Sequence, residues 1–358
     1  MWFSKLPSEL QTIFDTYAHF FPACAACVFE RDHVFFAVSG TALKPNFETT
    51  HADEYTVFDL ASLTKALAAA PSVFFLLQQR RLSLEDPIVH QLSVVRPELA
   101  AHLARVTVAH LLNHSAGFPA YVPFFETARN VDDMLAQLGQ VLPQSAPGVY
   151  FLYSDIGYIF LGQHLSQTVG SDWTMWAKKN LFPGFDFSFG EPRHDAIWAD
   201  NREPGCQKRG VHDENARLLG AYCAHAGLFG SLWDVTTWLQ RLCRMYAGEE
   251  SLLLLPAVVR RMWTPLDAND PFTLGFDRPA ASGFTAAGET ADRQAVIGHL
   301  GFAGTAFWLH PQRFRGGVLL TNRVALGRYA RIEELKHFRS EFFARLWEVS
   351  LETKSYNV

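Results

Sequence analysis

Strand patterns at both ends of the chain, with a mainly helical middle between them, constrain the fold more than any other feature. Five short apolar runs predict strands at 24–29, 33–38, 295–299, 305–310 and 317–321. The first two flank Arg31-Asp32, a spacing that predicts a β-hairpin. Because strands must bury their apolar faces against a common core, we expect an α+β fold in which both ends share one antiparallel sheet.

Two amphipathic segments are placed to cover this sheet. Residues 7–20 carry apolar side chains at a helical period, and 331–350 carry one apolar stripe. The middle of the chain has further helical patterns at 107–112, 131–138, 155–169 and 231–245. We expect a single domain, 1–358, with two lobes and a cleft where they meet. The sheet lobe is formed by 1–61 and 265–358, and the mainly helical lobe by 62–264.

Composition limits the classes of partner. The chain has 358 residues, of which 49% are hydrophobic, enough to bury a large core. A formal net charge of -5 and scattered Lys and Arg give no basic footprint, so we expect no nucleic-acid partner. No apolar stretch reaches the roughly 20 residues of a membrane span, since Pro71 interrupts 66–77. We expect no cofactor, and the oligomeric state is not indicated.

The cysteines favour a reducing compartment. Five is an odd and sparse number for a disulfide framework. Cys24 and Cys27 match C-x-x-C, but an offset of three in a strand points them to opposite faces, which argues against a redox or zinc role. The first ten residues lack the basic and apolar regions of a secretory signal. We expect a cytoplasmic protein, or a periplasmic one if the sequence is a trimmed mature form.

Ser62 and Lys65 form a Ser-x-x-Lys pair at the start of an apolar run. On a helix this spacing puts both side chains on one face, about 5–6 Å apart at Cβ. A lysine desolvated by Leu67, Phe74 and Phe75 can lose its proton and activate the serine as a nucleophile. About one such pair is expected by chance in a chain of this length, and the ordinary alternative is a helix N-cap followed by a surface lysine. The assignment therefore needs partners elsewhere.

Two further groups supply such partners. Tyr153 directly precedes a predicted helix, and its phenol can exchange a proton with Ser62 if Lys65 lowers its pKa. The alternative is a buried core tyrosine. His299 lies in a predicted strand on the same face as Gly301, where a glycine lets a substrate backbone approach closely. The alternative is a structural histidine.

In chain order, Ser-x-x-Lys, Tyr-x-Asp and His-x-Gly resemble the motifs of the serine β-lactamase and penicillin-binding-protein superfamily. The resemblance is closest to the branch related to class C β-lactamases, which also holds carboxylesterases, D-aminopeptidases and DD-peptidases, and it implies a β-lactamase/transpeptidase-like fold. It covers roughly 58–322, with matching linking segments at 111–117, 153–158 and 298–305. Two more segments, 209–216 and 224–229, are similar to members found with peptidoglycan-recycling enzymes.

The resemblance implies that Ser62 is the nucleophile, that Lys65 is its activating base and that Tyr153 is a second proton carrier. It places Asp155 where the family has Asn, and His299 where it has Lys. The backbone N–H groups of Ser62 and Phe302 would form the oxyanion hole. Each such donor contributes about 3 kcal/mol in the transition state of an acyl transfer.

Two positions depart from the family pattern. Asp155 has no amide N–H to give to a substrate carbonyl and, if ionised beside Lys65, favours the ammonium over the free base. Leu300 replaces the Ser or Thr whose hydroxyl commonly helps to hold the substrate carboxylate. Both changes argue against efficient penicillin hydrolysis and leave acyl-enzyme chemistry intact.

We therefore predict a serine hydrolase that forms an acyl-enzyme at Ser62. The substrate is a small molecule or short peptide of the D-amino-acid or muropeptide type, or an ester, with weak or no β-lactamase activity. We expect Arg209, His212 and Asp213 to line the cleft, with Arg209 binding a carboxylate. The alternative for Arg209 is a salt bridge to Asp213 that only fixes a loop.

Other functions remain as alternatives. The chain could be a carboxylesterase of the same branch, or a binding protein that kept the fold and lost activity. Residues 113–117 resemble a degenerate nucleophile elbow, but the first Gly and a preceding strand are missing. The spacing of His212, Asp213 and His225 does not match a common zinc motif, so we expect no metal.

Overall fold

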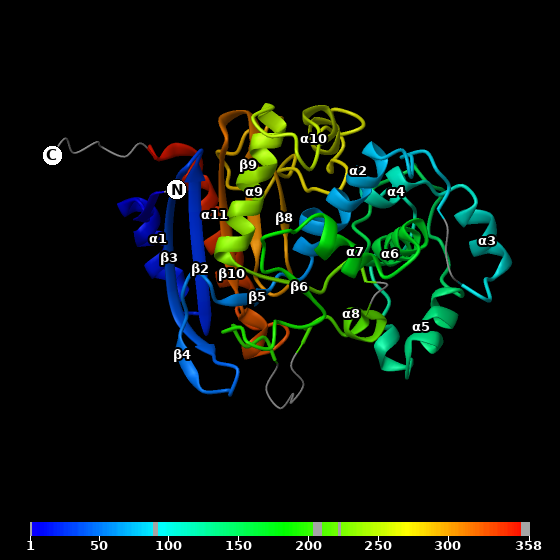
Figure 1. Cartoon of the computed structure of the whole chain (residues 1–358), viewed down its shortest axis with the longest axis horizontal. Helices are drawn as coiled ribbons and strands as arrows, with labels where there is room; N and C mark the ends of the chain where they lie inside the picture. The colour runs from blue at the N-terminus through cyan, green and yellow to red at the C-terminus, as the bar shows by residue number, and fades with distance from the viewer. Residues whose placement is uncertain (1, 89–91, 203–209, 221–222, 352–358) are drawn as a thin grey trace.

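The two ends of the chain form one sheet, as the sequence predicts. The computed structural model in Figure 1 describes residues 2–88, 92–202, 210–220 and 223–351. In these residues the strand order is β1-β3-β2-β10-β9-β8, with β4 paired to β3. Neighbouring strands are antiparallel except β1 and β3, which are parallel. The bounds are β1 Trp2–Lys5, β2 Ala23–Glu30, β3 His33–Leu43, β4 Thr49–His51, β8 Ile297–Leu300, β9 Ala306–His310 and β10 Arg315–Thr321.

The pairing of β2 with β10 joins the N-terminal and C-terminal parts of the chain, with Val318 opposite Cys27. Strand β2 is buried along almost its whole length, and alternate residues belong to two different apolar clusters. Cys24 lies in one cluster and Cys27 in the other, as strand alternation predicts. The sheet therefore has a buried layer on each face.

Helices form both of these layers. Helices α1 (Ser8–Ala18) and α11 (Ile332–Glu348) contact each other and cover one face, where Phe14 and Phe338 pack edge to face. Helix α9 (Leu232–Ala247) contacts β2 and β10 from the other face. Figure 1 shows α9 in front of the central strands. The first and last helices thus flank the sheet as expected, and α9, within 62–264, covers it as well.

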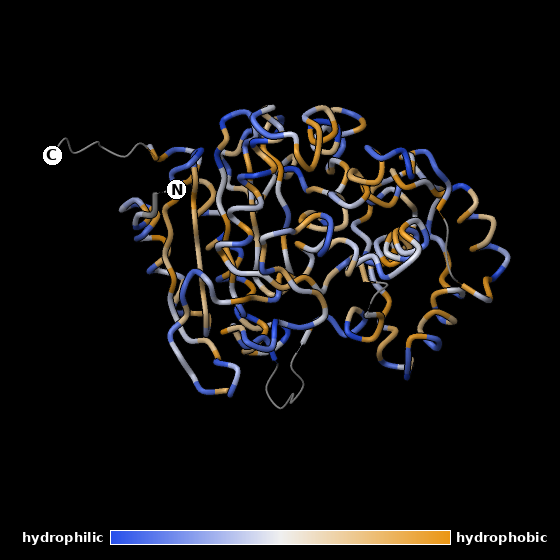
Figure 2. Tube along the Cα trace, in the orientation of Figure 1, coloured by the Kyte–Doolittle hydropathy of each residue, from blue (hydrophilic) through white to orange (hydrophobic). Residues whose placement is uncertain are grey.

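Most of the remaining helices lie beside the sheet, around α6, and α10 packs against α9 and α2 (Figure 1). Their bounds are α2 Ala70–Gln78, α3 Pro97–Leu103, α4 Val108–Leu112, α5 Val131–Leu138, α6 Asp155–Val169, α7 Trp173–Asn180, α8 Glu214–Leu219 and α10 Pro256–Trp263. Helix α6 is buried from Ile156 to Ser166, and Figure 2 shows its hydrophobic character at the centre of this region. No helix in the described part of the chain is both long and apolar enough to cross a bilayer.

A small second sheet lies where the sequence pattern indicated mostly helix. Strands β5 (Val57–Asp59), β7 (Leu228–Ser231) and β6 (Ser188–Phe189) pair antiparallel in the order β5-β7-β6. These strands are too short to show an alternating pattern, and their partners are distant in sequence. Their pairing brings the residues before β7 next to the turn that follows β5.

The N-terminus of α9 is held by a capping box. Ser231 Oγ accepts a hydrogen bond from the Asp234 N–H, and the Asp234 carboxylate accepts one from the Ser231 N–H, both 3.1 Å long. We expect Ser231→Ala to lower the free energy of unfolding by about 1 kcal/mol in urea denaturation. Thr237→Ala, which removes a hydroxyl bonded one turn back to Trp233 O, is the control with a smaller loss. Equal losses in the two variants would contradict a specific role for the cap.

Candidate active site

Ser62 lies in a tight turn between β5 and a helical segment. The preceding residue, Ala61, has a φ of 48°, in the left-handed region that non-glycine residues rarely adopt. Helical hydrogen bonding begins directly after Ser62, and Lys65–Ala69 forms a π-helical turn that continues into α2. Both features cost free energy, so they persist only where the surrounding structure stabilises them. They are frequent at functional sites.

A buried carboxylate stabilises this turn. Asp59 accepts hydrogen bonds of 2.8 Å from the Ala61 N–H, the His212 N–H and the Asn201 side-chain amide. Burial raises the pKa of the Asp59 carboxyl, and these three donors oppose that shift. Asp59 therefore fixes Ser62 relative to the segment that contains His212. The sequence analysis missed Asp59 and Asn201, since neither belongs to a spacing pattern.

The Lys65 side chain is fully buried, and its ammonium is surrounded by oxygen atoms. Nζ lies 3.0 Å from Ser62 Oγ, 2.8 Å from His225 O and 2.7 Å from Asp155 Oδ1. An ammonium has three N–H groups, so each has one oxygen neighbour. The structure therefore brings together the predicted nucleophile, the predicted base and Asp155.

Tyr153 also belongs to this group. Its ring centroid is 4.9 Å from Lys65 Nζ, and its hydroxyl interacts with Ser62. Burial of the hydroxyl, with the carboxylates of Asp155 and Asp277, raises its pKa well above the usual value, although the Ser62 hydrogen bond opposes this. The expectation that Lys65 lowers this pKa is therefore wrong, because desolvation of the phenolate dominates. Tyr153 is a phenol at neutral pH and can donate a proton.

His299 is buried at the end of β8, with its ring centroid 6.0 Å from that of Tyr153. Burial lowers its pKa, although Asp277 opposes the shift. Nδ1 is 2.8 Å from Leu300 O, which can only accept, so Nδ1 carries the proton of the neutral ring. Nε2 is then an acceptor, and it has no hydrogen-bond partner among the described residues. His299 thus supplies a neutral acceptor where the family has a cationic lysine.

The predicted oxyanion donors are the N–H groups of Ser62 and Phe302. Within the described residues, neither donates to a backbone carbonyl. The turn that carries Phe302 is held by two buried arginines. Arg339 donates to Gly301 O at 2.8 Å and to Thr305 O at 2.7 Å, and Arg323 donates to Phe302 O at 2.7 Å. These bonds fix the peptide groups before and after Phe302. Because the first of them contains the Phe302 nitrogen, its N–H has a defined direction.

The sequence patterns explain the residues at positions 300 and 301 only in part. A side chain at Gly301 would meet Thr305 Oγ1 at 2.0 Å and Leu60 O at 2.9 Å. The glycine is therefore required by contacts within the protein, and not only by the approach of a substrate. Leu300 packs against the apolar cluster under α11, on the other side of the strand from His299.

The predicted cleft residues have separate roles in the structure. His212 stacks on Phe302, with ring centroids 5.8 Å apart, and Phe302 is 43% exposed. Asp213 caps α8 and lies 3.0 Å from His225 Nε2, while the His225 carbonyl binds Lys65. Arg209, and with it the proposed salt bridge to Asp213, lies outside the described residues.

No group of three or more His, Cys, Asp or Glu side chains in the described ranges could hold a metal ion.

The Asp213–His225 pair gives a pH-dependent stability. Burial raises the pKa of Asp213, but His225 and the N–H of Ala216 lower it more, to about 2. A lowered carboxyl pKa stabilises the folded state above the unfolded pKa of about 4, and this stabilisation is lost as the pH falls toward 2. We expect Asp213→Asn to lose about 2 kcal/mol at pH 7 and progressively less below pH 4, in urea denaturation. Asp195→Asn, at an exposed carboxylate, is the control. A loss that is the same at pH 3 and pH 7 would exclude this linkage.

Comparisons with known proteins show the family of this chain. The family model described as Beta-lactamase matches residues 10–338. The N-acetylmuramyl-L-alanine amidase of Bacillus subtilis is 24% identical over 75% of this chain and 68% of its own length. A putative D-alanyl-D-alanine carboxypeptidase of Escherichia coli K12 is 23% identical over 75% of this chain and 69% of its own. The solved structure of a class C beta-lactamase mutant has a TM-score of 0.70 at 18% identity, covering 94% of this chain and 98% of that one. The chain therefore belongs to the Beta-lactamase family and is a serine hydrolase with the β-lactamase/transpeptidase fold.

Proposed function

We propose that the protein hydrolyses amide bonds in muropeptides or related D-amino-acid peptides through an acyl-enzyme at Ser62. The observation that carries the proposal is the 3.0 Å contact between Ser62 Oγ and the buried Lys65 Nζ. The ring centroid of Tyr153 lies 4.9 Å from the same nitrogen. Relatives named as a muramyl-alanine amidase and a putative D-alanyl-D-alanine carboxypeptidase support amide substrates from the cell wall. A cytoplasmic site of action fits the sparse cysteines, of which the four described are unpaired.

The proton balance assigns a role to each side chain. Tyr153 keeps its proton near neutral pH, so it does not accept the proton of Ser62 in the first step. Lys65 can accept that proton once its own has passed to Asp155, 2.7 Å away. Ser62 Oγ then attacks the carbonyl carbon, and the oxyanion is stabilised by the N–H groups of Ser62 and Phe302. Tyr153 donates its proton to the leaving amine and recovers it from the water that hydrolyses the acyl-enzyme.

An ester is the second candidate substrate. The neutral His299 and the apolar Leu300 leave the described part of the site without the cation and hydroxyl that hold a carboxylate in β-lactam-binding relatives. An uncharged ester needs neither group. A peptide carboxylate would need Arg209, which remains a prediction.

The first test replaces the nucleophile. We expect Ser62→Ala to lower turnover by several orders of magnitude, because attack by Oγ is lost. Covalent labelling by a fluorophosphonate should disappear as well, while the melting temperature stays near that of the wild type. The substrates are a muramyl-L-alanine peptide, a peptide ending in D-Ala-D-Ala, a short-chain nitrophenyl ester and nitrocefin. Wild-type protein that labels nowhere and hydrolyses none of them would favour the binding-protein alternative.

The second test exchanges the carboxylate beside Lys65. Asp155→Asn keeps the shape of the side chain, supplies an amide N–H to a substrate carbonyl and removes the charge that favours the ammonium. We expect penicillin acylation to rise about tenfold relative to ester hydrolysis, the value of one hydrogen bond in a polar site. An unchanged ratio would remove Asp155 from the explanation of substrate choice.

A further inference from the structure

A second group of reactive side chains lies behind the candidate active site. Cys223 Sγ is 3.6 Å from His225 Nδ1, and the other ring nitrogen of His225 is 3.0 Å from Asp213 Oδ1. A thiol, an imidazole and a carboxylate in this order form the arrangement that activates a cysteine nucleophile. Burial lowers the pKa of His225, but Cys223 and Asp213 raise it more, so this pKa lies well above its usual value. The imidazole can accept the thiol proton, and the Asp213 carboxylate can stabilise the imidazolium that forms.

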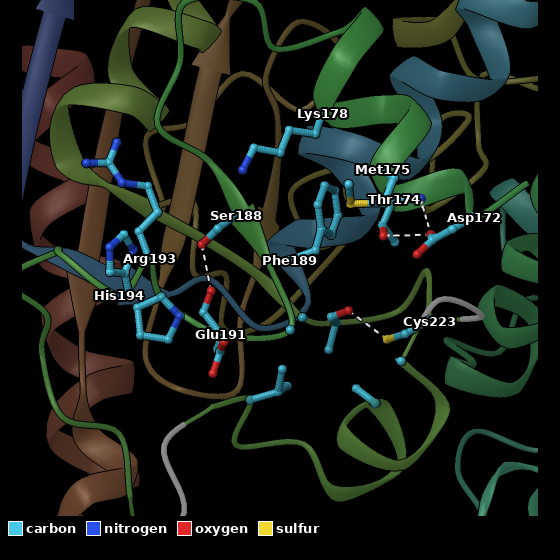
Figure 3. Close-up of a pocket in the computed structure, with 17 residues that line it drawn as sticks. Asp172, Thr174, Met175, Lys178, Ser188, Phe189, Glu191, Arg193, His194 and Cys223 are labelled. Carbon is cyan, nitrogen blue, oxygen red and sulfur yellow. Dashed lines mark hydrogen bonds between the residues drawn. The ribbon is translucent and has the colours of Figure 1, made fainter.

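Cys223 also borders a pocket that is separate from the residues around Ser62. The pocket has a volume of about 450 Å³, within the size range of small-molecule sites. Its walls come from α7, the turn after β6 and the segment around Cys223, and none of Ser62, Lys65, Tyr153 or His299 lines it. Figure 3 shows Cys223 at the wall of this pocket, with Phe189 and Glu191 among the residues that surround the space. Cys223 is only 4% exposed, so a small reagent in this pocket would have to reach the sulfur at the pocket wall.

The same short segment reaches both sites. Cys223, Ala226 and Gly227 line the pocket, whereas the carbonyl of His225, between them, accepts the hydrogen bond from Lys65 Nζ at 2.8 Å. The Cys223 thiol donates to Ala226 O at 2.7 Å, which helps to hold this turn. A group attached to Sγ would replace that hydrogen bond and occupy space beside His225. The His225 carbonyl would then shift relative to Lys65.

We propose that Cys223 is a thiol-modification site through which a small disulfide, entering the side pocket, inhibits the serine hydrolase. In the reaction the Cys223 thiolate attacks one sulfur of the disulfide, a mixed disulfide forms and the S–S bond of the reagent breaks. The second half leaves as a thiolate and takes up the proton that Cys223 lost, with His225 as the carrier. No other oxidant is needed. The inhibition rests on the proposed acylation of Ser62, whereas the reaction of Cys223 does not.

The test uses bis(2-hydroxyethyl) disulfide on folded protein in a Cys206→Ser background, because Cys206 lies outside the described residues. Mass spectrometry should find one adduct, on Cys223. Cys24, Cys27 and Cys243 are buried as well but do not line this pocket, and they serve as internal controls that should stay unmodified. The rate of fluorophosphonate labelling at Ser62 should fall by about tenfold to a hundredfold, as for a small misplacement of a catalytic group, and dithiothreitol should restore it.

Two matched variants complete the experiment. For Cys223→Ser, whose hydroxyl can keep the hydrogen bond to Ala226 O, and for Cys223→Ala, the disulfide should leave each variant's own rate of Ser62 labelling unchanged. The proposal is overturned if Cys223 stays unmodified in the folded protein, or if it is modified without any loss of Ser62 labelling. Failure of untreated protein to label at Ser62 counts against the proposed function, and failure of Cys223 to react counts against the thiol site, so the two failures are distinguishable.

Discussion

The buried ammonium of Lys65 is the interaction on which the rest of the site depends. Removing a cation from water costs several kcal/mol unless oxygen atoms replace the hydration shell. Here the oxygens come from Ser62 in the same turn, Asp155 at the start of α6 and His225 before β7. Three distant segments must therefore converge on one nitrogen atom. The small β5-β7-β6 sheet, with Asp59 beneath the Ser62 turn, provides this convergence.

The turn that contains Phe302 is also held by buried cations whose hydration shell is replaced by oxygen atoms, in this case arginines. Arg323 and Arg339 are buried and donate to backbone carbonyls on either side of the Phe302 nitrogen. Burial, together with the charge of Arg323, lowers the pKa of Arg339 to about 9, so it is still a cation at neutral pH. The two arginines thus orient the turn and place positive charge near the position where an oxyanion would form.

Much of the fold could be predicted from local patterns. The hairpin of β2 and β3, the caps of α6 and α9 and the closing helix α11 follow from alternation, helical period and N-cap residues. The short strands β5 to β7 could not, because two to four residues carry no period. The motifs also located the group around Ser62, but not Asp59, Asn201 or the partner of Asp213. These contacts depend on how loops fold back, which spacing along the sequence does not encode.

Asp155 is the residue on which our proposal of acyl transfer without strong recognition of a β-lactam depends. An asparagine would bind a substrate carbonyl and leave Lys65 with one neutral neighbour. The carboxylate instead compensates the buried ammonium and lies close enough to exchange a proton with it. In the mechanism that we propose, one proton moves within this pair before Ser62 attacks. Because burial keeps Tyr153 a phenol, the proposed proton donor for the leaving group is already in place when that transfer occurs.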